Sequence, residues 1–193
     1  MNFPLCPRFQ AVLFDMDGTL LDTLSDMQDA VNHILFENGW PQRTLEEIRA
    51  FVGNGAAKLM ERAIPEPIAP QRFHEILSTY KDWYQAHNCV KTAPYPGIPE
   101  VLAELEKMGV KTAVVSNKPD ATTKALAEKF FPGMPALGQR DGVDPKPSPA
   151  LVAQALSDLG VRPENAVYVG DSEVDVATAR NAGRYPDRPQ RRP

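Results

Sequence analysis

Cysteine is scarce in this chain, which has only Cys6 and Cys89 among its 193 residues. Two cysteines are too few for the disulfide framework of a small secreted domain, and neither belongs to a Cys-x-x-Cys motif. We interpret both as reduced thiols of a cytoplasmic protein, while the sequence leaves a disulfide between them open.

Long apolar runs are also missing, and none reaches the roughly 20 residues that span a membrane. Residues 1–10 lack a basic segment followed by an apolar one, so we expect no signal peptide. Positive charge is not in excess either, and the net charge of -4 argues against nucleic acid or an anionic membrane as a partner. A small phosphorylated partner stays open, because a bound cation reverses the field locally.

What remains is an ordinary globular composition, with 42% hydrophobic and 24% charged residues. A chain of this length buries a real core, so we expect one domain, or one domain with a modest insertion.

The stretch from Asp15 to Leu20 combines an apolar strand with two carboxylates. Ala11–Phe14 has strand length, Asp15 and Asp17 follow with one residue between them, and Gly18 permits a sharp turn. Side chains at i and i+2 of an extended chain share a face, so both carboxylates point to the carboxyl end of the strand, where open α/β sheets bind ligands. Such a pair suits a hard divalent cation such as Mg²⁺. The alternative is a surface turn of the Asp-x-Asp-Gly type.

Residues 21–90 show helical patterns and no convincing strand. Thr44, followed by Glu47 three residues later, predicts a capping box at the start of a helix. Apolar and aromatic side chains recur with helical spacing from Phe73 to Tyr84, which we attribute to core packing rather than to a ligand site. We therefore expect an all-helical insertion, with helices over residues 23–38, 44–51, 56–63 and 73–84.

After Pro94–Gly97 the pattern changes to alternating strands and helices, which predicts βαβ units and a parallel sheet. We expect strands over residues 110–115 and 166–169, with a short one within 132–143. The helices between and after them are expected over residues 98–108, 121–131, 149–159 and 173–182.

Polar residues follow each of the clearest strands. Ser116 and Asn117 come after one strand, and Asp171 and Ser172 come after another. Together with the pair at Asp15, these endings are expected to form a single crevice at the carboxyl edge of the sheet.

These residues also match a known family. The chain resembles the haloacid dehalogenase-like phosphohydrolases, within their phosphoglycolate phosphatase-like branch. Asp15–Leu20 resembles the first family motif, Ser116 the second, Lys146 the third, and Gly170–Asp175 the fourth. The resemblance runs from about Phe9 to Gly183.

The resemblance implies an α/β fold with a Rossmann-like parallel sheet core and a small all-helical cap inserted after the first strand. The core is expected in residues 1–20 and 91–183, and the cap in residues 21–90.

The resemblance also assigns roles in a two-step phosphate ester hydrolysis. Asp15 is implied as the nucleophile, Asp17 as general acid and then general base, and Lys146 as the cation that pairs with Asp15 and the phosphate. Mg²⁺ is implied on Asp15, the backbone carbonyl of Asp17, and Asp171. The remaining assignments are phosphate binding by Ser116, Asn117, Gly18 and Thr19, and support from Asp175 and Ser172.

Each residue also has a plainer interpretation when it is taken alone. Lys146 between two prolines is typical of a solvated loop, and Asp171 or Ser172 could simply cap the following helix. For substrate selection, Lys58 and Arg62 are a guess, as cations that could face a substrate carboxylate.

Residues 184–193 depart from the family pattern. This stretch holds three prolines and four arginines, which cannot form a core strand. We expect an irregular basic tail, a sheet truncated at its C-terminal edge, and reduced stability.

The predicted function is a Mg²⁺-dependent phosphatase that hydrolyses a small phosphorylated metabolite, with 2-phosphoglycolate as the leading candidate. The alternatives are a sugar-phosphate phosphatase, a phosphomutase of the β-phosphoglucomutase type, and a truncated, inactive relic. We expect a cytoplasmic monomer or weak homodimer that binds no nucleic acid and no membrane.

Overall fold

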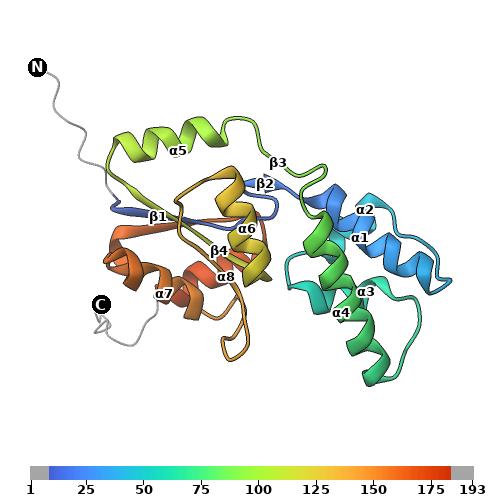
Figure 1. The fold of residues 1–193 in the computed structure, drawn as a ribbon. Helices are drawn as coiled ribbons and strands as arrows, with labels where there is room; N and C mark the ends of the chain where they lie inside the picture. The colour runs from blue at the N-terminus through green and yellow to red at the C-terminus, as the bar shows by residue number, and fades with distance from the viewer. Residues whose placement is uncertain (1–8, 184–193) are drawn as a thin grey trace, which may run out of the picture.

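The computed structural model describes residues 9–183 and contains, within that range, a parallel sheet of four strands in the order β5-β4-β1-β6 (Figure 1). Its central strand β1 pairs with β4 on one side and β6 on the other, with Ala11 opposite both Lys111 and Ala166. The α/β class and the parallel sheet predicted from the sequence are confirmed. The strand bounds are β1 Ala11–Phe14, β4 Lys111–Pro119, β5 Ala136–Gln139 and β6 Ala166–Val169.

Both faces of the sheet are covered, because alternate strand residues point to opposite sides. Leu13 and Val115 pack on one face with side chains of α7, such as Leu151. Phe14 and Val114 pack on the other face, against α6 and α5. The helix bounds are α5 Ile98–Lys107, α6 Asp120–Phe130, α7 Ala150–Leu159 and α8 Glu173–Ala182, and a short 3-10 turn spans Pro163–Asn165.

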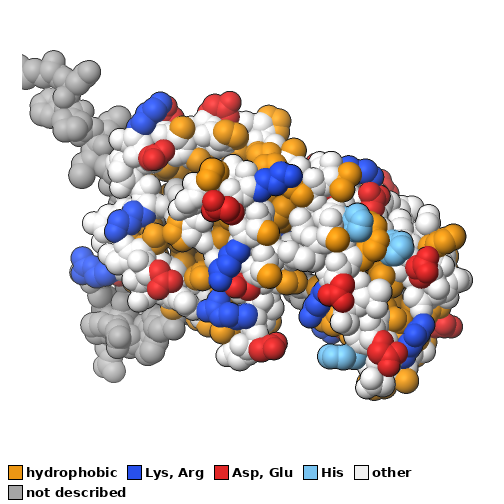
Figure 2. All heavy atoms as spheres, in the orientation of Figure 1, with side chains coloured by type: hydrophobic (Ala, Val, Ile, Leu, Met, Phe, Trp, Pro, Cys, Tyr) orange, Lys and Arg blue, Asp and Glu red, His pale blue; other side chains and the backbone are white. Residues whose placement is uncertain are grey.

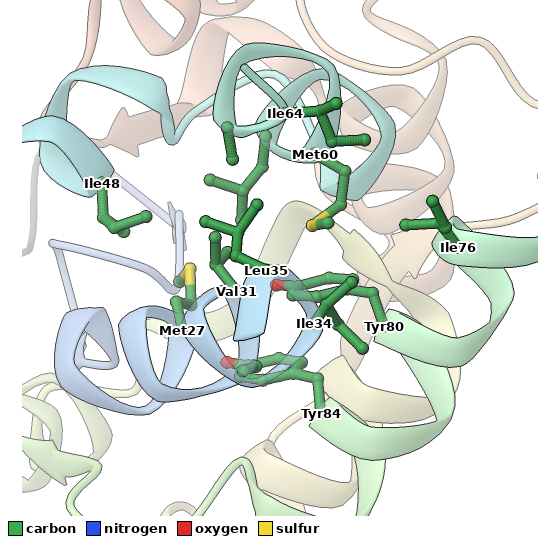
Figure 3. Close-up of a cluster of buried hydrophobic side chains, with 13 residues drawn as sticks. Met27, Val31, Ile34, Leu35, Ile48, Met60, Ile64, Ile76, Tyr80 and Tyr84 are labelled. Atoms are coloured by element: carbon green, nitrogen blue, oxygen red, sulfur yellow. The ribbon is translucent and has the colours of Figure 1, made fainter. Parts of the chain in front are cut away.

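The helical segment forms a bundle beside the sheet (Figure 1). Its helices share a hydrophobic cluster of their own, to which each contributes buried side chains (Figure 3). The capping box of Thr44 and Glu47 is present as predicted, and the apolar stripe from Phe73 to Tyr84 packs into this cluster. The bundle helices are α1 Leu24–Glu37, α2 Leu45–Phe51, α3 Ala56–Ala63 and α4 Pro70–His87.

The expectation that residues 21–90 hold no strand was wrong at their first two residues. Strand β2, Leu21–Asp22, pairs antiparallel with β3, Ala93–Pro94, where the chain leaves the sheet and returns to it. The buried carboxylate of Asp26 also accepts backbone N–H bonds from the returning chain at 90–92. A two-residue ladder carries no periodic signal, so the pattern of the sequence could not indicate it.

Strand β4 is longer than predicted and continues to Pro119. Ser116 and Asn117 therefore lie inside the strand and not after it, next to an irregularity in its pairing with β5 between Val115 and Pro119. Polar side chains at these positions are typical of a strand end, but here both are buried, and the amide of Asn117 bonds to Gly53 in the bundle and to Lys146.

Several expectations fall outside the described residues: the irregular tail at 184–193 with the truncated sheet edge, the thiol of Cys6, and most of the segment searched for a signal peptide. Of the helices within residues 9–183, none has both the length and the apolar composition that crossing a membrane requires. Acidic and basic side chains are interspersed over the face seen in Figure 2.

Candidate active site

A cavity of about 880 Å³ lies between the carboxyl edge of the sheet and the helical bundle. The sheet and its loops contribute polar side chains to it, and the bundle contributes a mixture of apolar, aromatic and charged ones. Its lining includes Asp15, Asp17, Gly18, Ser116, Asn117, Lys118, Asp171 and Ser172 from the sheet side, and Arg49, Leu59, Tyr80, Lys81, Tyr84 and Gln85 from the bundle.

Asp15 stands directly after β1, and its backbone N–H still donates to the carbonyl of Val169 on β6, at 2.8 Å. The sheet therefore fixes where this carboxylate lies. Its side chain is only 12% exposed, and one oxygen lies 2.9 Å from the ammonium of Lys146. Burial raises the pKa of Asp15 to about 6; Lys146 opposes the rise, and the charges of Asp175 and Asp17 add to it.

Lys146 is a buried residue, 3% exposed, and not a solvated loop lysine. Its ammonium contacts Asp15 Oδ1 at 2.9 Å, donates to Asp175 Oδ1 at 2.7 Å and donates to the hydroxyl of Tyr168 at 3.0 Å. Burial alone would lower its pKa, but the charges of Asp15 and Asp175 and the nearby Tyr168 outweigh burial and raise it. We call Asp15, Lys146, Tyr168 and Asp175 the Lys146 cluster.

Asp175 and Ser172 support this cluster from the start of α8. They form a reciprocal capping box, in which Ser172 Oγ accepts from the N–H of Asp175 and Asp175 Oδ2 accepts from the N–H of Ser172 at 3.1 Å. The other oxygen of Asp175 binds Lys146. Burial would raise the pKa of Asp175, but Lys146 and the bonds from Ser172 lower it overall. One carboxylate thus caps a helix and holds the buried cation.

Oxygen atoms of Asp15, Asp171 and Asp175 all lie within 4.8 Å of one another. Burial, with the charge of Asp175 adding to it, raises the pKa of Asp171 as well as that of Asp15. Crowded carboxylates that resist ionisation are relieved by a cation, and an all-oxygen donor set suits Mg²⁺. These residues therefore fit the expected metal.

Gly18 belongs to the same loop and has a φ of 80°, which favours glycine. A Cβ at this position would lie 2.2 Å from Asp171 Oδ2. The loop therefore lies so close to Asp171 that only glycine fits at this position. The hydroxyl of Thr19 faces Asp171 Oδ1 at 3.5 Å, and Thr19 is not among the residues that line the cavity.

Asp17 is held by a second group of residues. Its Oδ1 accepts from the hydroxyl of Thr23 at 2.7 Å and lies 3.0 Å from the ammonium of Lys118. Lys118 is itself 6% exposed, donates to the hydroxyl of Tyr84 at 2.8 Å, and sits 4.6 Å from the centre of that ring. We call Asp17, Thr23, Tyr84 and Lys118 the Lys118 cluster.

Sequence reasoning found neither Lys118 nor Tyr84 as site residues. The sequence carried no signal for Lys118, because a lysine that follows an apolar strand is ordinarily exposed, and its burial in β4 follows only from the fold. Tyr84 was correctly placed in the core of the bundle, but its hydroxyl also reaches the cavity side.

Ser116 is buried and lines the cavity, in a position to meet a bound group. The amide of Asn117 binds the backbone of Lys146 twice, accepting from its N–H at 2.7 Å and donating to its carbonyl at 3.0 Å. It also donates to the carbonyl of Gly53 in the bundle at 3.2 Å. Asn117 therefore shapes the pocket by joining the loop of Lys146 to the bundle.

The two cations guessed for substrate selection lie elsewhere. Arg62 donates to the carbonyl of Phe51 at 2.7 Å and to Asn54 at 3.0 Å, and Lys58 pairs with Glu61 at 2.6 Å. Neither lines the cavity. Among the described residues, the cations that line it are Arg49, Lys81 and Lys118.

A parallel sheet with a helical insertion and an acidic cavity at the carboxyl edge of its strands is the arrangement of an α/β protein with a ligand site. Residues 12–184 match the family of haloacid dehalogenase-like hydrolases. The chain belongs to this family.

Relatives within the family narrow the comparison. The chain is 36% identical over 186 residues to a phosphoglycolate phosphatase of Pseudomonas savastanoi pv. phaseolicola, with 89% of this chain and 66% of the relative covered. It is 34% identical to an N-acetylmuramic acid 6-phosphate phosphatase of Pseudomonas aeruginosa, with 91% and 79% covered. A solved structure from Haemophilus somnus, of a predicted phosphoglycolate phosphatase, superposes with a TM-score of 0.84 at 28% identity, covering 91% of this chain and 83% of that one. The chain thus spans 66% of the length of the phosphoglycolate phosphatase it matches.

Proposed function

We propose that this protein is a Mg²⁺-dependent phosphatase that acts through a phospho-aspartate on Asp15. The observation that carries the proposal is that Asp15, paired with a buried Lys146, faces the same cavity as Asp17. The family match and the phosphatase relatives support the same chemistry.

The first step forms a bond between a carboxylate oxygen of Asp15 and phosphorus, while the bond from phosphorus to the ester oxygen breaks. Asp17, in its protonated form, gives its proton to the departing alkoxide. In the second step Asp17 takes a proton from water, the water oxygen bonds to phosphorus, and the acyl phosphate bond breaks to release phosphate and restore Asp15.

The remaining site residues have positioning and electrostatic roles in this proposal. Lys146 stabilises the charge that spreads over the phosphoryl oxygens, and Asp175 with Ser172 keeps its ammonium in place. Ser116 donates its hydroxyl to a phosphoryl oxygen, and Asn117 shapes that pocket. Gly18 and Thr19, also expected at the phosphate, donate their N–H groups within the loop itself, to the carbonyls of Leu21 at 3.0 Å and Met16 at 3.3 Å, so their part is to shape that loop.

The expected metal-binding residues are Asp15, Asp171 and the backbone carbonyl of Asp17. When bound there, Mg²⁺ would offset the negative charge of the nucleophile and of the phosphoryl group. The carboxylate oxygens clustered at Asp15, Asp171 and Asp175 support this assignment.

We propose 2-phosphoglycolate as the leading substrate. The phosphoglycolate phosphatase relatives support it, as do Arg49 and Lys81, two cations on the bundle side of the cavity that could pair with the substrate carboxylate. The helical bundle, residues 21–90, would act as a cap that closes the site against bulk water, with residues 1–20 and 91–183 as the catalytic core.

A sugar-phosphate phosphatase is the second candidate, and the size of the cavity favours it. A volume of about 880 Å³ is near the upper end of ligand pockets, and 2-phosphoglycolate would fill only a small part of it. The relative that acts on N-acetylmuramic acid 6-phosphate supports a larger substrate in a chain of similar build.

A cytoplasmic monomer or weak homodimer is part of the same proposal.

The test is phosphate release from 2-phosphoglycolate, beside sugar 6-phosphates, with Mg²⁺ and then with EDTA, for the wild type and Asp15→Asn. We expect metal-dependent release that the variant lacks, and the ratio of kcat/KM values decides between the two substrates. Product analysis separates hydrolysis from transfer of the phosphoryl group to a sugar. Absence of release from every ester by the folded wild type would contradict the proposal.

A further inference from the structure

Lys118 is a buried cation that the proposed chemistry does not yet use. We infer that Lys118 is a positioning residue that holds the carboxylate of Asp17 for proton transfer, and that Tyr84 ties this hold to the docking of helix α4 against the sheet. The inference rests on the proposed function, because it concerns the acid and base of that reaction.

The geometry limits what the ammonium of Lys118 can do. A charge this deeply buried is stable only when it is paired and hydrogen-bonded. Here the partners are Asp17 Oδ1 at 3.0 Å and the hydroxyl of Tyr84 at 2.8 Å, and the Tyr84 ring lies 4.6 Å from the ammonium. The ammonium of Lys118 therefore already contacts Asp17 and Tyr84.

The two donors to Asp17 reach the same oxygen. Thr23 and Lys118 both contact Oδ1, and within residues 9–183 no protein donor holds Oδ2. The side chain of Asp17 keeps 14% of its surface exposed and lines the cavity. One oxygen is thus anchored, and the other is left to carry the proton toward a leaving group.

The anchor is assembled from both parts of the molecule. Lys118 comes from strand β4, whereas Tyr84 comes from α4, where it lies beside Tyr80 in the hydrophobic cluster of the bundle (Figure 3). The contact between Gln85 and Thr122 joins α4 to α6 next to it. Movement of α4 away from the sheet would remove one partner of Lys118 and loosen its hold on Asp17.

A role in orienting the acid has a kinetic signature that a general structural role lacks. Protonation by a positioned acid contributes about 10²–10⁴-fold to the departure of a poor leaving group and much less to that of a good one. Loss of the anchor should therefore slow the cleavage of esters according to their leaving group.

The experiment compares phenyl phosphate with 4-nitrophenyl phosphate, because both lack a carboxylate and phenol is the poorer leaving group. Single-turnover release of phenol or 4-nitrophenolate with Mg²⁺, with enzyme in excess over the ester, isolates the first step. The variants are Lys118→Met, Tyr84→Phe, Asp17→Asn and the double variant Asp17→Asn/Lys118→Met. Lys124→Met on the exposed face of α6 is the matched control.

We expect Lys118→Met to slow phenol release about 100-fold and 4-nitrophenolate release less than about fivefold. Tyr84→Phe keeps the ring, so it should show the same selectivity with a loss of about fivefold. In the Asp17→Asn background, Lys118→Met should cause no further loss, because residues that act as a unit are not additive.

Equal losses for both esters, or a full additional loss in the Asp17→Asn background, would overturn the inference and assign Lys118 to direct binding of the phosphoryl group. If Lys118→Met does not fold, Tyr84→Phe decides by the same criterion. Absence of release by the folded wild type from both aryl esters, from 2-phosphoglycolate and from the sugar 6-phosphates would instead overturn the proposed function, and this assignment with it.

Discussion

Two buried lysines, Lys146 and Lys118, hold the two aspartates of one loop in different ways. Every member of the Lys146 cluster comes from the sheet side: Asp15 after β1, Tyr168 on β6, Asp175 on α8 and Lys146 on the loop before α7. The Lys118 cluster comes from both parts of the molecule. Lys118 lies on β4, Thr23 directly precedes the first helix of the bundle, and Tyr84 lies within α4 of the bundle.

Under the proposed function, this difference indicates how the two steps of the reaction would be controlled. Asp15, the proposed nucleophile, directly follows a strand that is paired on both sides, and its N–H bonds to β6, so the sheet sets its backbone position. Asp17, the proposed acid and base, is held where the bundle meets the sheet. An enzyme built in this way holds its nucleophile ready and completes its acid when the site is closed.

The largest effect that would test this contrast is expected from Lys146→Met. The change removes the cation that pairs with Asp15, so we expect kcat to fall by about 10²–10³, as when one preorganised electrostatic donor is lost. The loss should be similar for phenyl and 4-nitrophenyl phosphate, because the charge on the phosphoryl group is common to both. The assays above measure it.

The exposed lysine of the Lys107–Glu104 pair provides the control, Lys107→Met, which should leave kcat unchanged. If Lys146→Met slowed the cleavage of phenyl phosphate but not that of 4-nitrophenyl phosphate, the contrast between the clusters would be contradicted.

Asp15→Asn tests the burial of Asp15 through the pH dependence of the free energy of unfolding. Burial raises the pKa of Asp15 from 3.8 to about 6, so its ionisation costs more free energy in the folded chain than in the unfolded one. In EDTA this group favours folding fully below pH 4, and that contribution is lost as the pH rises to about 6. At about 1.4 kcal/mol per pH unit, the wild type should lose about 3 kcal/mol over this interval.

Asp15→Asn should escape that loss, so its free energy of unfolding relative to the wild type should rise between pH 4 and pH 7 and then level off. Urea titrations at several pH values measure it, with Asp158→Asn on the surface of α7 as the control. Parallel pH dependences for wild type and Asp15→Asn would contradict the burial cost.

A smaller effect is expected from Asp175→Asn. The amide still accepts bonds from Ser172 but no longer pairs a full charge with Lys146, so we expect kcat to fall about 10- to 100-fold, as for partners that orient a metal or a cation. The loss should again be equal for the two aryl esters. Steady-state assays across Mg²⁺ concentrations measure it, and Glu173→Gln, in the first turn of α8, is the matched control.

The sequence was sufficient to predict the Lys146 cluster in large part. Asp15, Lys146 and Asp175 belong to motifs, and local periodicity predicted β1, β6 and α8 around them. Tyr168 was not predicted, because its hydroxyl contacts the cluster from a strand position that pattern alone assigns to the core.

The Lys118 cluster could not be predicted in the same way. Tyr84 and Lys118 lie 34 residues apart, on elements whose contact depends on how the bundle docks, and no local pattern reports a docking angle. An aromatic residue in a helical stripe predicts packing. Here the Tyr84 ring packs in the bundle, and its hydroxyl oxygen also accepts a hydrogen bond from the ammonium of Lys118.

Thr23→Val should cause the smallest effect, and it therefore provides the most sensitive test of the difference between the two clusters. It removes one neutral donor to Asp17 Oδ1 and leaves Lys118 in place, so a single hydrogen bond of about 1 kcal/mol is lost and phenol release should slow about fivefold. Release of 4-nitrophenolate should be nearly unchanged, which distinguishes this residue from any in the Lys146 cluster. Thr79→Val, on the exposed face of α4, is the matched control. If Thr23→Val slowed both esters equally, Asp17 would not be the group through which Thr23 acts, and the contrast between the clusters would lose its kinetic meaning.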